Sequence, residues 1–529
     1  MLDVPKIDIR PDHLEIVQGI LKKYVPLCEV WAFGSRAKWT AKEYSDLDLA
    51  IITDRPLSLD VSASLSDDFS ESDLPWRVDV VDWATTSESF RKVIERDKIV
   101  VQEGKQSTGM ANEWSTAPLG ELCLKITDGA HSSPPSVQFG KKMASVKDLT
   151  QFGVDLKDAR NISKADFDFL VKQGCQPQVG DVLIAKDGNS ALDTTCLVKK
   201  PLDAVLLSSV AILRPNPEKL FPESLKQHLS SPRTIEYLKS EFISGAAIPR
   251  VILKDFKRAI INVPPLKEQR TIAHILGTLD DKIELNRKQN ETLEAMARAL
   301  FKAWFVDFEP VRAKMEGRWV RGQSLPGLPA HLFDLFPDKL VESELGDIPE
   351  GWGVKKIEDV ITRLSVGKKY EQKTVLPKGI VPVLDQGKSG VIGFHNDTPS
   401  VVATSESPVV VFANHTCYMR LINFPFSAIQ NVLPFIGKEL PTIWVYFATI
   451  GKQSFVEYKG HWPDFVIHEL AVPAENLAKD FAKITSTYLK QIWENERESL
   501  SLSQLRDTLL PKLISGELRV PAAMVEGII

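Results

Sequence analysis

Cysteine is scarce in this chain: there are five among 529 residues, and no two of them stand in a CxxC spacing. This scarcity excludes a disulfide framework and the common zinc-binding patterns. Long hydrophobic runs are missing too, since none approaches the ~20 apolar residues of a membrane helix. The first residues, MLDVPKIDIR, lack the apolar segment of a signal peptide. We therefore expect a cytoplasmic protein with no membrane contact.

Catalytic motifs are also few. The sequence contains neither HExxH nor GxSxG, which argues against a metalloprotease or a serine hydrolase. The GKS at 387–389 has Pro382 where a phosphate-binding loop needs its upstream glycine. The Pro-Pro pairs at 134–135 and 264–265 lack the Asn/Asp-Pro-Pro-aromatic context of an amino-methyltransferase. Most of the chain is therefore expected to bind a target rather than to catalyse.

No large excess of charge of one sign is present, because the net charge is −5. Residues 1–105 carry 14 basic and 20 acidic residues, a net of −6, and the remaining 51 basic and 50 acidic residues give +1. The acidity belongs to the first fifth of the chain and does not argue against nucleic-acid binding by the rest. The length predicts three or four domains at ~150 residues each.

The first segment combines a Gly-Ser pair with spaced carboxylates. A β-prone run, CEVWAFGSR, ends in Gly34, Ser35 and Arg36, and after a ten-residue spacer Asp46 and Asp48 lead into the strand-like LAII. Alternate side chains of a strand share a face, so the two carboxylates lie together and favour a hard cation such as Mg²⁺. The run RVDVVD offers a third carboxylate, for which we favour Asp79 over the oppositely facing Asp82.

This pattern resembles the minimal nucleotidyltransferases of the DNA polymerase β superfamily over about residues 10–100. The resemblance implies an α/β domain that binds nucleotide phosphates through Gly34, Ser35 and Arg36. It also implies Asp46, Asp48 and Asp79 as catalytic ligands of one or two Mg²⁺ ions, which stabilise in-line attack on the α-phosphate. Two alternatives stay open: a βαβ fragment with an acidic strand end, and a degenerate module that binds nucleotide without reacting.

The remaining chain contains an internal repeat. Each copy opens with a Trp-led apolar segment, from Glu113 and from Gly351. In both copies an Asp-Phe pair is followed by six residues and Val-Pro, at 255–264 and at 464–473. A long helical pattern comes after each Val-Pro. These matching offsets predict two globules, each followed by a long helix.

The two helices are expected at 268–305 and 477–510, with apolar positions that follow coiled-coil spacing. Both apolar seams turn polar midway, at Asn286 and Asn290 in the first helix and at Gln491, Asn495 and Glu498 in the second. If the helices pair antiparallel, these groups meet, and buried amides fix the register at some cost in stability. Pro511 is expected to end or kink the second helix. The alternative is that each helix packs separately on its own globule.

The expected architecture is an α+β multidomain protein in which two globules are separated by two long antiparallel coiled-coil helices. The expected segments are 1–105 (nucleotidyltransferase-like domain), 112–265 (first globule), 266–308 (long helix), 309–350 (connector), 351–473 (second globule) and 474–520 (second long helix). A helix of 38 residues spans ~57 Å, or ~17 base pairs at ~3.4 Å per pair. Two heads held at a fixed separation suit a target with two separate elements, such as duplex DNA.

The region from VPPLKEQRTIAHILGTLDD to KMEGR resembles the central conserved region of type I restriction–modification specificity (S) subunits, and SELGDIPEGW and LLPKLISGEL are equally typical of them. The resemblance covers about residues 112–520. It implies two target recognition domains that each read half of a bipartite site in double-stranded DNA. It further implies that the helices dock two modification (M) methyltransferase subunits, that restriction (R) subunits join them, and that the protein serves phage defence in bacteria or archaea. The first domain departs from this family pattern.

Base-reading side chains are expected on loops of each globule. The candidates are Lys186 and Asn189 in the first globule and Asn414 and Arg420 in the second, and for each the alternative is a solvated turn. Two other functions also stay open. The chain could be primarily an antitoxin-like nucleotidyltransferase that uses the globules to localise or sense DNA, or an assembly hub whose globules bind protein.

Overall fold

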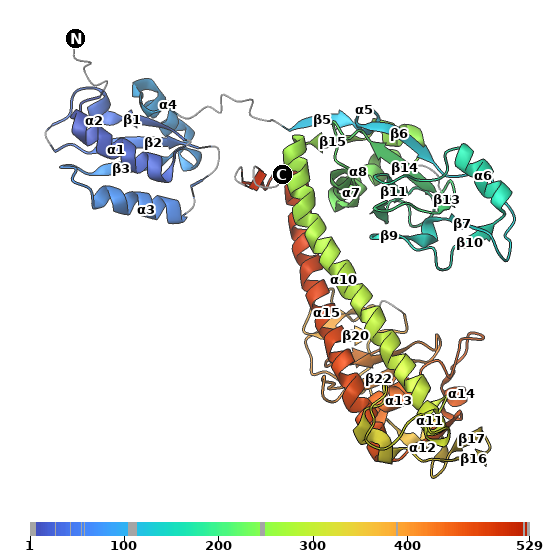
Figure 1. Ribbon diagram of the computed structural model, residues 1–529. Helices are drawn as coiled ribbons and strands as arrows, with labels where there is room; N and C mark the ends of the chain where they lie inside the picture. The colour runs from blue at the N-terminus through green and yellow to red at the C-terminus, as the bar shows by residue number, and fades with distance from the viewer. Residues whose placement is uncertain are drawn as a thin grey trace. The chain divides into compact units, whose positions relative to one another are not determined.

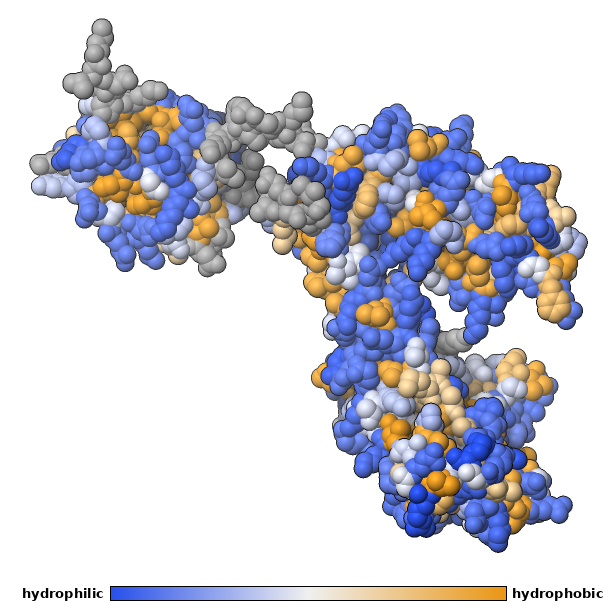
Figure 2. Space-filling model, in the orientation of Figure 1, coloured by the Kyte–Doolittle hydropathy of each residue, from blue (hydrophilic) through white to orange (hydrophobic). Residues whose placement is uncertain are grey.

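The computed structural model describes residues 7–26, 28–42, 44–53, 56–57, 59–103, 114–243, 249–387, 390–521 and 524–525. They form two compact units, Met1–Ser115 and Thr116–Ile529 (Figure 1). The face of each unit that Figure 2 shows is mainly hydrophilic with separate apolar patches. No described helix is long and apolar enough to cross a membrane. The expected α+β multidomain fold is confirmed.

The first unit is a four-stranded sheet in the order β3-β2-β1-β4, with β2 and β3 parallel. Leu47, Leu49 and Ile51 alternate along β2 and point into the core beneath α1 and α3. Ala50 lies on the opposite face, together with Ile94 of α4. The elements are α1 (Pro11–Tyr24), β1 (Glu29–Phe33), α2 (Gly34–Ala37), β2 (Leu47–Ile52), α3 (Leu59–Ser70), β3 (Val78–Asp82), α4 (Glu88–Asp97) and β4 (Ile99–Gln102).

The second unit begins with a globule built on a sheet in the order β12-β11-β14-β6. A smaller sheet, β10-β7-β13, has one antiparallel and one parallel pairing, and β5 pairs with β15. The elements are β5 (Ser115–Pro118), α5 (Leu119–Leu122), β6 (Cys123–Asp128), β7 (Lys141–Ala144), β8 (Leu149–Thr150), β9 (Gly153–Val154), β10 (Arg160–Ile162), α6 (Lys164–Lys172), β11 (Val182–Ala185), β12 (Thr195–Leu197), β13 (Ala204–Leu206), β14 (Val210–Pro215), α7 (Pro222–Ser230), α8 (Pro232–Phe242), α9 (Leu253–Arg258) and β15 (Ile260–Val263).

A second globule repeats this topology: its sheets are β19-β25-β22-β23 and β21-β20-β24, and β18 pairs with β26. The parallel pair recurs as β20 with β24. Phe256 and Phe465, the phenylalanines of the repeated Asp-Phe pairs, are both fully buried. The internal repeat is therefore confirmed. The elements are β18 (Gly353–Lys356), α12 (Ile357–Val360), β19 (Ile361–Arg363), β20 (Val381–Leu384), β21 (Val391–His395), β22 (Val409–Ala413), β23 (Met419–Ile422), β24 (Ser427–Ala428), β25 (Val432–Gly437), α13 (Thr442–Thr449), α14 (Trp462–Val466) and β26 (Glu469–Val472).

Two long helices, α10 (Leu266–Phe305) and α15 (Glu475–Ser515), lie side by side and antiparallel (Figure 1). Of the two outcomes expected at Pro511, an end of the helix or a kink, the first is wrong, because α15 runs on to Ser515 and stops at Gly516, whose φ is +77°. Proline removes one backbone hydrogen bond, but Leu513 and Ile514 beyond it are buried. Their burial offsets the lost hydrogen bond.

The middle of the helix pair is polar and symmetric. Asn286, fully buried, donates through Nδ2 to Glu498 Oε2 at 2.7 Å and to Ser499 Oγ at 3.2 Å. Asn495, also buried, donates to Asn290 Oδ1 at 2.8 Å and to Gln289 Oε1 at 3.4 Å. Gln491 in turn donates to Asn495 Oδ1 at 2.9 Å.

One offset of 209 residues relates these contacts. Adding 209 to a residue number in the first half of the repeat gives the equivalent residue in the second half. The equivalent pairs are Asn286 and Asn495, Gln289 and Glu498, Asn290 and Ser499, and also Phe256 and Phe465. The amide layer is therefore the centre of a pseudo-twofold relation between the two halves of the repeat.

The two ends of the helix pair are held by different forces. At the second globule, Phe301 and Phe305 of α10 form an aromatic core with Trp444 and Phe481. The connector after α10, with α11 (Glu309–Met315), η3 (Ala330–Leu335), β16 (Leu340–Ser343) and β17 (Gly346–Pro349), adds to that core.

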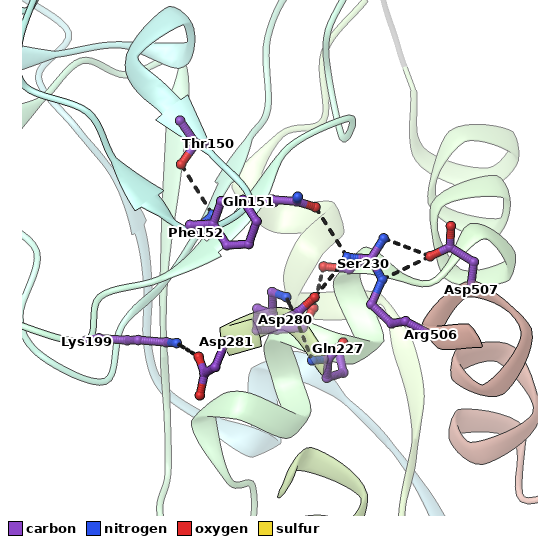
Figure 3. Close-up of polar contacts among 11 residues, drawn as sticks. Thr150, Gln151, Phe152, Lys199, Gln227, Ser230, Asp280, Asp281, Arg506 and Asp507 are labelled. Carbon is purple, nitrogen blue, oxygen red and sulfur yellow. Dashed lines mark hydrogen bonds and ion pairs between the residues drawn. The ribbon is translucent and has the colours of Figure 1, made fainter. Parts of the chain in front are cut away.

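At the first globule the contact includes a cluster of ion pairs (Figure 3), together with the hydrogen bonds of Gln269 with Phe221 N and Lys219 O. Asp280 of α10 meets Lys226 Nζ of α7 at 2.5 Å and Arg506 Nη1 of α15 at 2.8 Å. The position equivalent to Asp280 at the other end is Leu489, which is buried. A cavity of about 720 Å³ opens beside this ionic junction.

Replacing Asp280 with Asn should destabilise the second unit by about 2–3 kcal/mol, because it leaves the largely buried Lys226 without its anion and removes one of the two anions of Arg506, which keeps Asp507. Asp281→Asn is the matched control: its ion pair with Lys199 is exposed, and its loss should cost about 0–1 kcal/mol. Thermal unfolding of both variants measures the difference. Equal effects of the two substitutions would show that the junction contributes no more than a surface pair.

The same junction predicts a pH dependence. Burial raises the pKa of Asp280, but Lys226 and Arg506 outweigh it and hold this pKa below its usual range. The stabilisation is therefore fully present above the unfolded-state pKa of ~3.9 and is lost as the pH falls through the lower folded value.

Candidate functional site

The Gly-Ser turn of the first unit lies directly against a carboxylate. Gly34 follows β1 at the start of α2 with φ +77°, and a Cβ on it would meet Asp48 Oδ2 at 2.2 Å. Only glycine permits this approach, since it has no side chain and tolerates positive φ. The turn and the carboxylate strand are thus closely adjacent, as the spacing of Gly34, Ser35 and the two aspartates predicts.

The carboxylates come from neighbouring strands. Asp48 is the direct cross-strand partner of Asp79 on β3, and Asp46 lies just before β2. Burial, and then repulsion by Asp79 and Asp46, raise the pKa of Asp48. Arg77 Nε lies 3.2 Å from Asp79 Oδ1. Among the described residues no three His, Cys, Asp or Glu side chains form a metal-binding group. Carboxylate oxygens of this kind suit a hard cation that a phosphate ligand also binds.

Arg36 has a structural position. It is 5% exposed and donates to the backbone oxygens of Ser45 at 2.8 Å and Asp8 at 2.9 Å. Its guanidinium lies over the Trp76 ring, 4.4 Å from the centroid. These contacts favour a role for Arg36 in positioning the loop before Asp46, rather than direct contact with a triphosphate.

In each globule of the second unit one turn, called the pinned turn below, is held by an equivalent pair of backbone hydrogen bonds. After β11, the backbone N of Lys186 donates to Ser209 O and its O accepts from Val251 N. After β22, the backbone N of Asn414 donates to Asn431 O and its O accepts from His461 N. Lys186 and Asn414 therefore occupy equivalent positions in the two globules.

The side chains of the four candidate base readers differ in availability. Lys186 is 6% exposed and lies 3.4 Å from Asp128 Oδ2 and 3.3 Å from Asp187 Oδ2, so its cation is neutralised inside the globule. Asn189, in the same turn, is exposed.

In the second globule two of the candidates hold loops together. Asn414 Oδ1 accepts from Trp462 N at 2.9 Å, which joins the turn after β22 to the start of α14. Arg420 donates to the backbone oxygens of Asp385 at 3.4 Å and Gly390 at 3.2 Å. These contacts place Lys186, Asn414 and Arg420 as supports of the loops.

The sequence did not single out His415 and Tyr458, two residues that lie beside these supporting side chains. His415 N donates to Gln386 Oε1 at 2.8 Å, and the His415 ring stacks on Tyr458 with centroids 4.9 Å apart. Tyr458 is 84% exposed. The available signal was the aromatic-rich stretch SFVEYKGHW, which reads as a loop from composition alone.

Comparisons with known proteins divide the chain close to the boundary between the two compact units. Residues 15–107 match the family "Polymerase beta, Nucleotidyltransferase", and residues 113–295 match "Type I restriction modification DNA specificity domain". The probable protein adenylyltransferase MntA of Haemophilus influenzae is 52% identical over 107 residues, which cover 20% of this chain and 94% of that protein.

The remainder is similar to specificity subunits. The HindI specificity subunit of Haemophilus influenzae is 26% identical over 402 residues, covering 64% of this chain and 86% of that protein. A solved type I S subunit from M. genitalium aligns at TM-score 0.46 and 15% identity over 77% of this chain and 97% of that chain. By these family matches the chain belongs to the polymerase beta nucleotidyltransferase family through its first domain and carries a type I restriction modification DNA specificity domain over residues 113–295, while the rest of the chain is similar to specificity subunits.

Proposed function

We propose that the second unit reads a bipartite site in double-stranded DNA, with one globule on each half-site and the helix pair setting the gap. The observation that carries this proposal is the repeated topology at the two ends of one antiparallel helix pair, with the same pinned turn in each globule. Two copies of one reading module held apart by a rigid spacer suit two separate sequence elements. The exposed residues of each turn would contact base edges.

The helix pair would also dock two modification methyltransferase subunits, to which restriction subunits join. Met296 and Leu505 are related by the same 209-residue offset and are 46% and 48% exposed on α10 and α15. Because the two side chains are equivalent, each would meet the same surface of one partner copy. A pair related by a pseudo-twofold axis suits two copies of one partner.

The experiment that tests this function is methylation mapping in cells that express the chain with its modification subunit. The expected result is one motif made of two short elements with a fixed gap. Methylation at a single continuous motif, or without sequence preference, would contradict the proposal and favour a hub that binds protein.

For the first domain we propose transfer of a nucleotidyl group, with transfer of AMP from ATP to a protein and release of pyrophosphate as the reaction that the name of its relative MntA suggests. Asp46, Asp48 and Asp79 would hold Mg²⁺, which when bound stabilises charge on the phosphates. The Gly34–Ser35 turn would hold the phosphates beside them. The contact of Gly34 with Asp48 supports this arrangement. The S-subunit function remains the primary proposal, because most of the chain serves it.

Asp48→Asn should abolish transfer of label from α-labelled ATP and should also stabilise the first domain in the absence of Mg²⁺. The reason is that burial and two neighbouring carboxylates already oppose the Asp48 charge and raise its pKa. Its charged form therefore costs stability as the pH rises through that value. Exposed Glu71→Gln is the control.

Two readouts separate the outcomes of this test. Mg²⁺ should raise the unfolding temperature of the wild-type chain and of Glu71→Gln, but not that of Asp48→Asn. A degenerate module would show no label transfer in any variant. An equal response of all three proteins to Mg²⁺ would remove Asp48 from the cation site.

A further inference from the structure

The second globule carries an exposed apolar tip on the loop between α13 and α14. Phe455, Val456 and Tyr458 are 56%, 74% and 84% exposed within four positions. Most of the visible surface of this unit is hydrophilic (Figure 2). Consecutive large apolar side chains in solvent mark a surface that contacts something else.

The base of this loop is braced by a buried histidine. His461 is fully buried, with Nε2 3.0 Å from Glu457 O and Nδ1 3.4 Å from Gln453 Nε2. Gln453 Oε1 lies 3.1 Å from His468 Nε2. The Phe455 ring packs edge-on against His461, with centroids 6.0 Å apart. The exposed tip is therefore held in a defined conformation before any partner binds.

The tip also adjoins the pinned turn of the second globule. Tyr458 stacks on His415, and His415 Nδ1 lies 2.9 Å from Lys459 O. Asn414 fixes the backbone of His461 and Trp462, because its backbone O accepts from His461 N and its Oδ1 accepts from Trp462 N. The apolar tip and the polar turn thus form one continuous surface.

We propose that this loop is a DNA wedge: Phe455 and Val456 enter the minor groove of the second half-site and partly unstack a base step, beside the turn that reads base edges. Proteins that bend DNA insert such apolar side chains and kink the duplex by ~20–90°. This proposal rests on the proposed DNA-reading function. DNA is favoured over a protein partner because the tip continues the polar turn and exposed Lys452 stands at the start of the loop. Lys459 pairs with Glu457 and Asp464 and adds no free cation.

The test uses the full chain with its modification subunits and a duplex carrying the motif found by methylation mapping. 2-Aminopurine is placed in turn at each step of the second half-site, and the duplex ends carry a fluorescence-transfer pair. Wild type should raise 2-aminopurine fluorescence at one step and shorten the end-to-end distance. Phe455→Ser/Val456→Ser should lose both signals and bind about tenfold more weakly, while keeping its preference for the motif.

Two further variants make the result decisive. Phe455→Leu should retain the signals, since leucine also acts as a wedge. Phe139→Ser removes an exposed aromatic of the first globule and should leave the second half-site unchanged. Unaltered unstacking and bending in the double variant would overturn the wedge, as would loss of modification subunits from that variant. Absence of motif preference in wild type would instead overturn the DNA-reading function itself.

Discussion

The antiparallel contact of α10 with α15 is the constraint on which the second unit depends. Each helix presents an apolar seam that is interrupted in its middle by amides, and these amides find partners only in one register. Asn286 and Asn495 occupy equivalent positions and each donates to the equivalent pair on the other helix. A shift by one heptad would place buried amides against apolar side chains, at a cost of unsatisfied polar groups. The register in turn fixes how far apart the helix pair holds the two globules.

The same backbone plan is attached to this spacer in two physically different ways. The second globule shares an aromatic core with the helices, and such a contact stabilises by burial. The first globule meets the helices through Asp280, Lys226 and Arg506 beside a cavity, and removing one charge from such a cluster is costly. Symmetry therefore applies to the topology and the central layer, while the two junctions have diverged. The two globules therefore differ at their junctions while the central layer of the helix pair stays symmetric.

Much of this arrangement follows from periodicity in the sequence. The heptad spacing, the polar midpoints and the repeated Asp-Phe and Val-Pro offsets predict the helices, their pairing and the two globules. The roles of individual polar residues do not follow, because they depend on partners distant in sequence. Lys186 reads as an exposed cation in its turn, yet Asp128, from another strand, neutralises it. The guanidinium of Arg36 stacks on Trp76 and donates to two backbone carbonyls. Pro511 is accommodated inside α15, where the residues beyond it are buried.

The central claim is that the helix pair sets the gap between two DNA half-sites. It is tested most directly by deleting seven residues from α10 and the seven paired residues from α15, on the second-globule side of the amide layer, and mapping methylation. Removing ~10 Å of helix should shorten the gap by about three base pairs and leave both half-site sequences unchanged. A gap of unaltered length, with methylation preserved, would contradict the claim.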